Sequence, residues 1–255
     1  MRIPRIYTPQ ALPADLNQSS AQASPHASVL VLEGSAANHV GRVLRMTPGR
    51  ELKIFNGESQ GHYQGIITDV TKKTVTVNLT EFIATENESP LSIHLGQAIS
   101  KGDRMDFTIQ KSVELGVNVI TPLWTQRCDV KLNGDRLEKK LQHWQQVAIS
   151  ACEQSGRDRV PTIAAPLKLE QWVESIQSDE RWVLDPRGKL DESKSTDTNS
   201  AALLVGPEGG LTEEEILIAA EKGFKAKLIG PRVLRTETAA LTAITLMQSQ
   251  WGDFL

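Results

Sequence analysis

The sequence predicts an α/β protein in which a small β-rich module precedes a larger domain with a mainly parallel sheet. Three observations support this prediction. Residues 1–88 contain short apolar segments that alternate with polar residues, and the charged segment 85–90 interrupts that pattern. From Leu91 onward, strand-like and helix-like segments alternate along the chain. We therefore expect two domains, residues 1–88 and residues 89–255.

The composition is that of a globular protein. Of the 255 residues, 39% are hydrophobic and 23% are charged, and the formal net charge is −3. That charge argues against coating nucleic acid by bulk attraction, although a local basic surface remains compatible with it. The apolar segments are too short to span a bilayer and the N-terminus lacks a signal-peptide pattern, so we expect a cytoplasmic protein without a membrane partner. The two cysteines and five histidines show no metal-ligand spacing, which predicts reduced thiols and no metal site.

The first domain is predicted to be a small β-barrel. Val75, Val77 and Leu79 alternate with polar residues, as in a half-buried strand. Asn56 followed by Gly57 is a strong hairpin signal. The polar, small-residue segment 14–28 is predicted to be a mobile loop.

A short helix is predicted over residues 35–44, and arginines lie near it and near the N-terminus. These arginines are able to converge into a phosphate-contacting patch, and the alternative is that they are ordinary solvated surface residues. The four residues concerned are Arg2, Arg5, Arg42 and Arg45.

The second domain should contain strands and helices in alternation. Strands are predicted over 91–99, 117–124, 160–164, 182–185, 201–205 and 226–229. Helices are predicted over 103–115, 135–152 and 169–176, from the capping box of Thr212 and Glu215 to Gly223, and along the apolar stripe Ala240, Ile244, Met247 and Trp251. The polar segment 186–200 is predicted to be an exposed loop.

Two glycine-bearing loops follow neighbouring apolar segments and predict a ligand site. Residues 203–205 lead into the loop 206–210, and residues 228–231 lead into the polar segment 232–238. Glycines at the ends of buried strands let the backbone approach a ligand closely. The loops carry neither a P-loop nor a dinucleotide-binding signature. They suit an adenine or amino-acid group, and ordinary strand-to-helix turns are the alternative.

These two loops closely resemble the C-terminal signatures of the RsmE family, the 16S ribosomal RNA uracil-N3 methyltransferases. Other similar segments occur in the same order along the chain, at residues 39–45, 101–105, 110–117 and 151–157. The chain departs from the family at residues 126–128, where only Arg127 is kept, and at Cys152, which replaces a usual alanine.

The resemblance implies an N-terminal PUA-like β-barrel for RNA and a C-terminal SPOUT methyltransferase domain with a trefoil knot. It also implies a homodimer, S-adenosyl-L-methionine as cofactor and 16S ribosomal RNA of the small subunit as partner. By position, the cofactor-binding residues would be Leu204, Gly206, Pro207, Glu208, Gly209, Gly210, Ile229, Gly230, Leu234, Arg235 and Thr236. The RNA-binding residues would be Arg2, Arg5, His39, Arg42, Arg45, Lys101, Arg104 and Arg157.

Methylation at uracil N3 requires loss of the imide proton and stabilisation of the negative charge that then spreads onto O2 and O4. We expect Arg235 and Arg127 to stabilise that charge, and either Glu237 or Glu153 to accept the proton or orient the base. A partner of a helix N-terminus is an equally good interpretation of Glu237. N3 lies on the Watson–Crick edge, so the uridine must be unpaired or flipped out.

Two alternatives to uracil-N3 methylation remain at this point. One is a SPOUT methyltransferase that acts on a different RNA or atom, such as the ribose 2′-hydroxyl. The other is a non-catalytic RNA-binding protein that keeps the fold. Binding of the methyl donor and the position of any added methyl group would separate these three functions.

Overall fold

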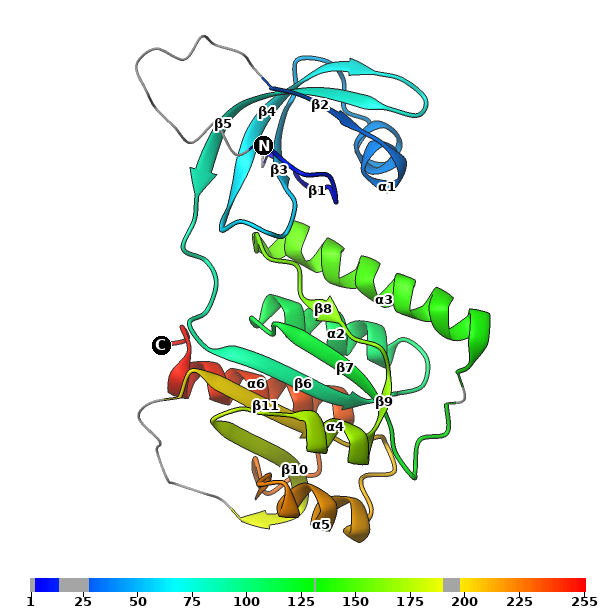
Figure 1. The fold of residues 1–255 in the computed structure, drawn as a ribbon, viewed down its shortest axis with the longest axis vertical. Coiled ribbons are helices and arrows are strands. Elements are labelled where there is room, and N and C mark those ends of the chain that lie inside the picture. Colours follow the sequence, from blue (N-terminus) through cyan, green and yellow to red (C-terminus); the bar gives the residue numbers. More distant parts are fainter. Residues whose placement is uncertain (1–2, 14–27, 131, 190–197) are drawn as a thin grey trace. The chain divides into compact units, whose positions relative to one another are not determined.

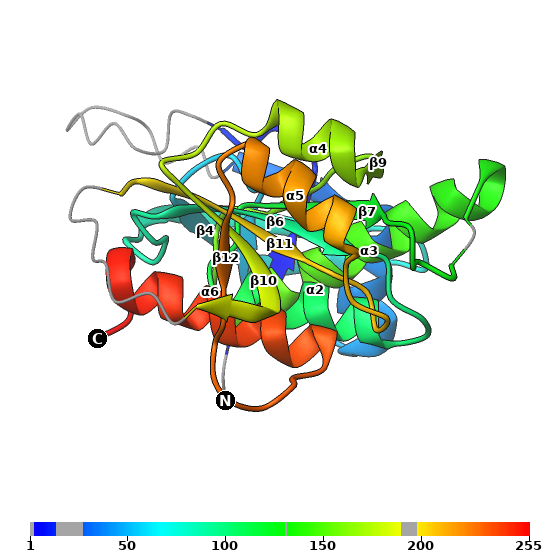
Figure 2. The ribbon, with the colours of Figure 1, turned by 90° about the horizontal axis from the view of Figure 1, so that it is seen from below.

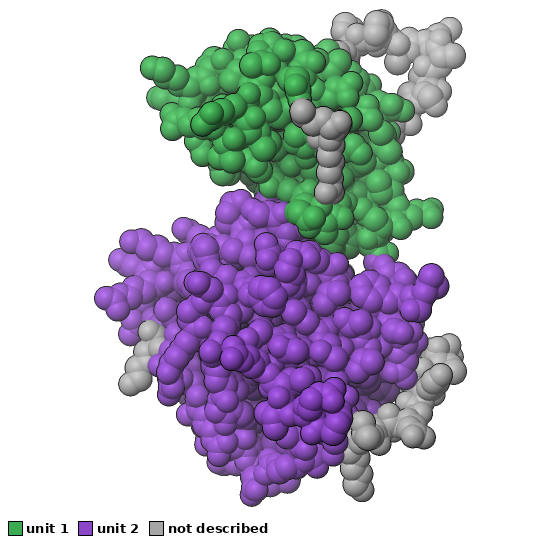
Figure 3. Space-filling model, turned by 180° about the vertical axis from the view of Figure 1, so that it is seen from behind, with its two compact units in different colours: residues 1–88, 152–160 green, residues 89–151, 161–255 purple. Residues whose placement is uncertain are grey.

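The computed structural model describes residues 3–13, 28–130, 132–189 and 198–255. The chain divides into two compact units, residues 1–88 with 152–160 and residues 89–151 with 161–255 (Figure 3). The chain therefore enters the first unit a second time at residues 152–160, which no sequence pattern indicated. The loop predicted over residues 14–28 lies outside the described residues except for Ser28.

The first unit contains a five-stranded sheet in the order β1-β3-β4-β5-β2 (Figure 1). β1 pairs in parallel with β3, and the other neighbours are antiparallel. The alternating residues Val75, Val77 and Leu79 are all buried, as their period of two predicted. The hairpin predicted from Asn56 and Gly57 is the connection between β3 and β4. The strands are β1 (Arg5–Tyr7), β2 (Ser28–Leu32), β3 (Glu51–Phe55), β4 (Gly61–Val70) and β5 (Val75–Ala84).

The helix predicted over residues 35–44 forms in two parts, α1 (Gly34–Asn38) and the π-helix η2 (His39–Val43). The main-chain N–H of Leu44 donates to the carbonyl of His39 at 2.9 Å, five residues back. This wider turn changes which residues face the core, so Val40 is fully buried whereas Val43 is 64% exposed. Arg45 follows with a φ of 50°, the only positive φ of a non-glycine residue among those described.

The second unit contains a seven-stranded sheet in the order β12-β10-β11-β6-β7-β8, with β9 also beside β7. All its described pairings are parallel, which confirms the predicted mainly parallel sheet. The strands are β6 (Ser92–Ala98), β7 (Val119–Trp124), β8 (Thr162–Ile163), β9 (Leu167–Lys168), β10 (Glu180–Lys189), β11 (Ser200–Val205) and β12 (Lys225–Lys227).

The loop prediction for residues 186–200 is wrong at both of its ends. β10 continues to Lys189, and β11 begins at Ser200. The register of β10 against β12 shifts between Leu184 and Lys189, so the strand bulges around Pro186 and then pairs again with Lys227. A proline followed by polar residues is typical of a turn, which is why a loop was predicted here. A β-bulge nevertheless accommodates a proline within a strand. Residues 190–197 lie outside the described residues.

The helices of the second unit cover both faces of its sheet. Figure 2 shows α4 and α5 on one face and α2 and α6 on the other, and the two members of each pair pack together. The predicted capping box is present, since the Thr212 hydroxyl accepts from the Glu215 N–H at 3.2 Å and Glu215 Oε2 accepts from the Thr212 N–H at 2.8 Å. The helices are α2 (Arg104–Glu114), α3 (Gly134–Ser155), α4 (Leu169–Ser175), α5 (Glu213–Glu221) and α6 (Thr236–Trp251).

The strand order of the second sheet reverses beside β6. β7 and β8 follow on one side of β6, whereas β11, β10 and β12 lie on its other side. Open parallel sheets bind ligands beyond the carboxyl ends of their strands, near such a reversal. The two glycine-bearing loops follow β11 and β12, so they begin at the edge of the sheet where a ligand is expected.

Gly96 in β6 lies directly under the buried indole of Trp172 from α4. A Cβ atom at position 96 would lie 2.6 Å from Cη2 and 2.7 Å from Cζ2 of that ring. We expect Gly96→Ala to lower the free energy of unfolding by about 1–3 kcal/mol, because the ring has to move within a packed core. Urea unfolding monitored by circular dichroism measures this change. Gly230→Ala is the control, since a Cβ atom there meets nothing within 4 Å; equal losses in both variants would contradict the packing argument.

Candidate functional site

A cavity of about 1020 Å³ lies at the carboxyl ends of β10, β11 and β12. Its walls come from residues 184–187, from residues 205–211 after β11, and from most of residues 227–239 after β12. The two glycine-bearing loops, which are separate in the sequence, therefore line a single cavity. Its volume is at the upper end of the range for small-molecule sites, about 300–1,000 Å³.

Thr236 joins the two loops at the start of α6. Its hydroxyl donates to the carbonyl of Gly206 at 2.7 Å and accepts from Gln97 Nε2 at 2.9 Å. A hydroxyl suits this position because it donates and accepts at the same time. Gly206 is also required, since a Cβ atom there would lie 2.9 Å from Leu211 Cγ and 3.1 Å from Leu211 N.

We expect Thr236→Val to lower the free energy of unfolding by about 1–3 kcal/mol, although it preserves the shape of the side chain. The substitution leaves the Gly206 carbonyl without this donor and the amide of Gln97 without this acceptor. Thermal unfolding measured by calorimetry tests the expectation. Thr238→Val makes the same chemical change at an exposed position two residues later and should be nearly neutral. A neutral Thr236→Val would mean that the bridge contributes nothing to stability.

Arg127 is attached to the first loop. Its Nη1 donates to the carbonyl of Gly209 at 2.9 Å and approaches the carbonyl of Leu211 at 3.5 Å. A guanidinium offers five N–H donors, so these contacts occupy only part of its capacity. Arg127 therefore lines the cavity and at the same time fixes the path of the loop.

The Glu208 side chain, in the same loop, is bound by residues of the segment 101–104. Its Oε1 accepts from Arg104 Nη1 at 2.8 Å and from the main-chain N–H of Lys101 at 3.2 Å. Burial alone would raise the pKa of Glu208, but hydrogen bonds from its own main-chain N–H, from Arg104 and from Lys101 outweigh burial and lower it. Glu208 is therefore ionised and bound to Arg104 at neutral pH.

Glu237 and Arg235 bring opposite charges to the cavity from the start of α6. Arg235 is the exposed residue that precedes the helix. Glu237 Oε2 is buried and has no hydrogen-bond partner among the described residues. A buried carboxylate oxygen without a donor is costly, and a donor from a bound ligand would satisfy it. The other carboxylate considered, Glu153, does not line this cavity: it accepts from the Tyr7 N–H at 3.0 Å.

The cavity contains nearly all the residues that the sequence associated with a cofactor. Leu204 is the exception, because it is fully buried in the core of the second unit. All ten others line the cavity: Gly206, Pro207, Glu208, Gly209, Gly210, Ile229, Gly230, Leu234, Arg235 and Thr236.

Several cavity residues were missed by the sequence analysis. Asp185 Oδ1 accepts from the N–H and Nε of Arg187 at 3.0 and 3.2 Å, so these two residues form one edge of the cavity. Lys227 Nζ lies 4.9 Å from the centroid of the Trp182 ring. Gln97 does not line the cavity itself, but it is fully buried and donates to Thr236, which does. A polar residue at or near the end of an apolar strand segment is the signal that these positions share.

The residues expected to contact RNA are found in different environments. Arg42 and Arg45 are exposed, and His39 Nδ1 lies 3.5 Å from Glu153 Oε2. In the second unit, Lys101 and Arg104 are exposed beside the cavity. Arg2 lies outside the described residues.

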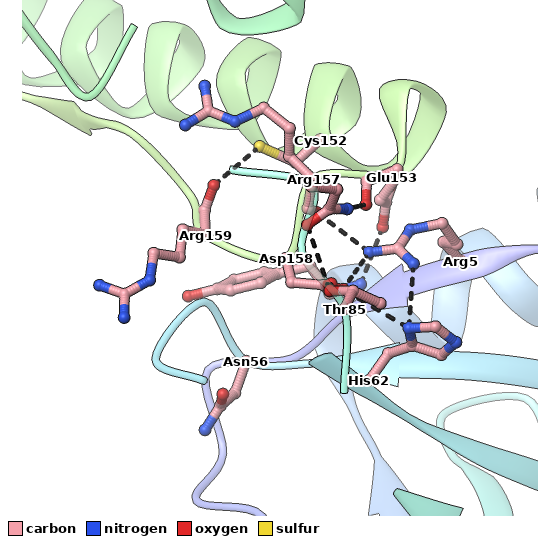
Figure 4. A network of polar contacts seen from close by, with 12 residues as sticks. Arg5, Asn56, His62, Thr85, Cys152, Glu153, Arg157, Asp158 and Arg159 are labelled. Atoms are coloured by element: carbon pink, nitrogen blue, oxygen red, sulfur yellow. Dashed lines mark hydrogen bonds and ion pairs between the residues drawn. The ribbon is translucent and has the colours of Figure 1, made fainter. Parts of the chain in front are cut away.

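Arg5 and Arg157 do not have the exposure that an RNA contact requires. Arg5 forms a buried ion pair with Asp158 (Figure 4). In a second buried pair, Arg157 Nη2 lies 2.7 Å from Glu88 Oε2. The two arginine side chains are only 7% and 6% exposed. Both buried guanidinium groups are matched by carboxylates within the first unit, so neither is available for a phosphate.

Residues 3–13, 28–130, 132–189 and 198–255 contain no group of three His, Cys, Asp or Glu side chains placed to hold a metal ion. Within the same ranges, none of the helices combines the length and apolar character that crossing a membrane requires.

Comparison with known proteins relates both units to RNA methyltransferases. Residues 87–248 match the RNA methyltransferase domain family, and residues 32–80 match the RNA methyltransferase PUA domain family. Ribosomal RNA small subunit methyltransferase E of Buchnera aphidicola subsp. Acyrthosiphon pisum is 37% identical over 99% of this chain and 96% of its own length. The enzyme of the same name from Bacillus subtilis is 29% identical over 86% of this chain and 89% of its own.

Two solved structures are similar over the full length of both chains. Ribosomal RNA small subunit methyltransferase E of Neisseria gonorrhoeae, bound to S-adenosyl methionine, has a TM-score of 0.88 and 37% identity. A protein of Legionella pneumophila in complex with bound S-adenosylmethionine has a TM-score of 0.90 and 41% identity. On the domain matches and on the near-complete coverage at 37% identity, the chain belongs to the ribosomal RNA small subunit methyltransferase E family.

Proposed function

We propose that this protein transfers a methyl group from S-adenosyl-L-methionine to N3 of a uridine in small-subunit 16S ribosomal RNA. Membership of the methyltransferase E family and the S-adenosylmethionine in two similar structures support methylation of ribosomal RNA. The observation that carries the proposal is the cavity in which two glycine-bearing loops meet the unpaired Glu237 carboxylate oxygen.

The residues of the cavity fit this cofactor. Val205, Ile229 and Leu234 supply apolar surface for an adenine ring, while the main chain of residues 206–210 offers N–H and carbonyl groups for its polar edge. Residues 229–230 and 234–236 would hold the cofactor from the second loop. When bound, the cofactor supplies the methyl group as an electrophile attached to a sulfonium.

Glu237 is our candidate for the group that takes the proton from uracil N3. Its free oxygen is already desolvated and lacks a donor, so an imide N–H that reached it would form a hydrogen bond before transfer. Arg235, two residues earlier, would stabilise the negative charge on O2 or O4. Arg127 acts mainly as a positioning residue, because it holds the carbonyl of Gly209.

The first unit would supply the remaining contacts to RNA. Exposed Arg42 lies within the π-helix η2, and exposed Arg45, which has a positive φ, follows two residues after its end. Such backbone features often mark functional sites. We further propose that the protein works in the cytoplasm on the small ribosomal subunit as a homodimer, and that the segment after β12 forms a trefoil knot. The family resemblance supports these points, and the names of the relatives support RNA of the small ribosomal subunit as the substrate.

Incubation of small ribosomal subunits and of naked 16S ribosomal RNA with the protein and labelled S-adenosylmethionine tests the proposal. We expect one added methyl group, on N3 of a single uridine, when nuclease fragments are mapped by mass spectrometry. A methyl group on a ribose 2′-oxygen would identify a different methyltransferase. Calorimetry with S-adenosylmethionine separates a non-catalytic RNA-binding protein, which should release no heat.

A further inference from the structure

A second cavity, of about 570 Å³, lies beside the first. It shares Arg104, Arg127, Glu208 and Gly209 with the larger cavity and adds Lys101, Gln126 and Asp129. Three cationic and two anionic side chains therefore line a small space next to the loop that would hold the methyl donor. The three additional residues have no part in the cofactor binding or the proton transfer proposed above.

Each cation in this cavity already has a partner within the protein. Lys101 Nζ lies 2.6 Å from Asp129 Oδ2, and Arg127 holds the carbonyl of Gly209. Glu208 Oε1 lies between two donors from different groups, the Arg104 guanidinium and the main-chain N–H of Lys101. An oxyanion held by one arginine and one main-chain N–H is also the arrangement in which proteins bind phosphate oxygens.

We propose that Arg104 and the main-chain N–H of Lys101 bind a phosphate of the substrate RNA, and that Glu208 occupies this phosphate site until RNA displaces it. The inference deepens the proposed function and rests on it, since it assumes that RNA reaches the cofactor cavity from this side. The segment 101–104 then binds an RNA phosphate, and Glu208 regulates RNA binding by competing for the same site.

The ion pair has the properties that such an exchange requires. The side chains of Arg104 and Glu208 are 43% and 34% exposed, so water and salt weaken their attraction. A phosphate offers several charged oxygens in the geometry that a guanidinium prefers, so it competes well with a single carboxylate oxygen. Glu208 belongs to the loop 206–210 that would hold the cofactor. When RNA arrives and separates Glu208 from Arg104, this loop therefore loses one of its contacts.

A double-mutant cycle tests the exchange. Wild-type protein, Glu208→Gln, Arg104→Gln and the double variant are titrated with a fluorescent single-stranded oligoribonucleotide that contains uridine, over a series of salt concentrations and without methyl donor. We expect Glu208→Gln to tighten RNA binding by about two- to fivefold, because the competing carboxylate is neutralised. Arg104→Gln should weaken binding and reduce the slope of log affinity against log salt by about 0.7, the loss of one single-strand phosphate contact. In the double variant the gain from Glu208→Gln should disappear.

Asp129→Asn is the matched control, since it removes the same charge from the same cavity and its partner is Lys101. Any gain from Asp129→Asn should persist when Arg104 is replaced. The inference is overturned if Glu208→Gln brings no gain, if its gain persists without Arg104, or if wild-type protein binds no RNA. Because no methyl transfer is measured here, failure of the mass mapping would overturn the proposed function and leave this result intact.

Discussion

Glu237→Gln is expected to lower kcat for RNA methylation by about 10²–10⁴-fold while the affinity for S-adenosylmethionine changes little. Glutamine has nearly the same size and retains an oxygen, but it does not accept a proton at neutral pH. Glu237 lines the cavity, and its Oε2 is buried without a hydrogen-bond partner among the described residues, so a donor from a ligand would satisfy it. Single-turnover rates with excess enzyme, together with calorimetric titration of the cofactor, measure both quantities.

Glu213→Gln is the control for this substitution. Glu213 lines the same cavity, but its side chain is 84% exposed and pairs with Arg187 at 2.8 Å. We expect the methylation rate of Glu213→Gln to remain within a few-fold of the wild-type rate, since the Glu213 carboxylate is exposed and already paired. A large loss of cofactor affinity in Glu237→Gln with an unchanged kcat would assign Glu237 to cofactor binding and contradict its role as the proton acceptor.

Asp158→Asn should lower the free energy of unfolding of the first unit by about 3–5 kcal/mol, since it leaves the Arg5 charge buried without its counter-ion. Figure 4 shows Arg5, His62 and Thr85 directed at the Asp158 carboxylate. The Asp158 side chain is fully buried. In the variant, therefore, water does not reach the Arg5 guanidinium to compensate for the lost carboxylate charge. Urea unfolding of the full chain, monitored by a probe in the first unit, measures the loss.

The pH dependence provides a second measurement on the same residue. Burial alone would raise the pKa of Asp158, but hydrogen bonds from His62, Thr85 and Arg5 outweigh it and place the pKa below the ordinary 3.8. A carboxyl group whose pKa is lowered by folding stabilises the protein above its ordinary value, and this contribution is lost as the pH falls through the lowered pKa. The stabilities of wild type and Asp158→Asn should therefore converge in strong acid. Asp69→Asn, at an exposed position in β4, should change stability little at any pH.

The pH dependence of the second unit should differ because of His94. Burial lowers the pKa of His94 to about 4, and its Nε2 lies 2.8 Å from Thr121 Oγ1 and accepts from Trp172 Nε1 at 3.2 Å. In the unfolded chain His94 takes up a proton near its ordinary pKa of 6.5, whereas in the folded chain it stays neutral until about pH 4. Protonation therefore favours the unfolded chain, and the free energy of unfolding falls as the pH drops from 6.5 towards 4. Unfolding of His94→Gln should lack this component, whereas an unchanged slope between those pH values would contradict it.

The features predicted well from the sequence depend on neighbouring residues. The capping box of Thr212 and Glu215 lies within four residues, and the alternation of Val75, Val77 and Leu79 lies within one strand. The fold class followed from such local signals, and the two loops of the cavity were found because each follows an apolar strand segment. Local patterns identify elements because helix and strand periodicities are set by the backbone.

The features that were not predicted depend on residues far apart in the chain. Arg5 and Asp158 are separated by 153 positions, and nothing near Arg5 distinguishes a buried arginine from one that binds phosphate. In the sequence, Gln97 merely interrupts an apolar strand. Its role becomes visible only in the structure, where it donates to Thr236. The extension of β10 past Pro186 needs β12 as a partner. Tertiary pairing determined each outcome, and one sequence does not reveal such pairs.

The return of residues 152–160 to the first unit limits how this protein can be divided or recombined. A fragment that ends at residue 88 contains Arg5 and Glu88 but lacks Asp158 and Arg157, which neutralise them. Such a fragment would bury unmatched charges and should be expressed poorly on its own. The first unit is therefore not a self-contained module. Its exchange between homologues in evolution would require the simultaneous exchange of the end of α3 and the turn that follows.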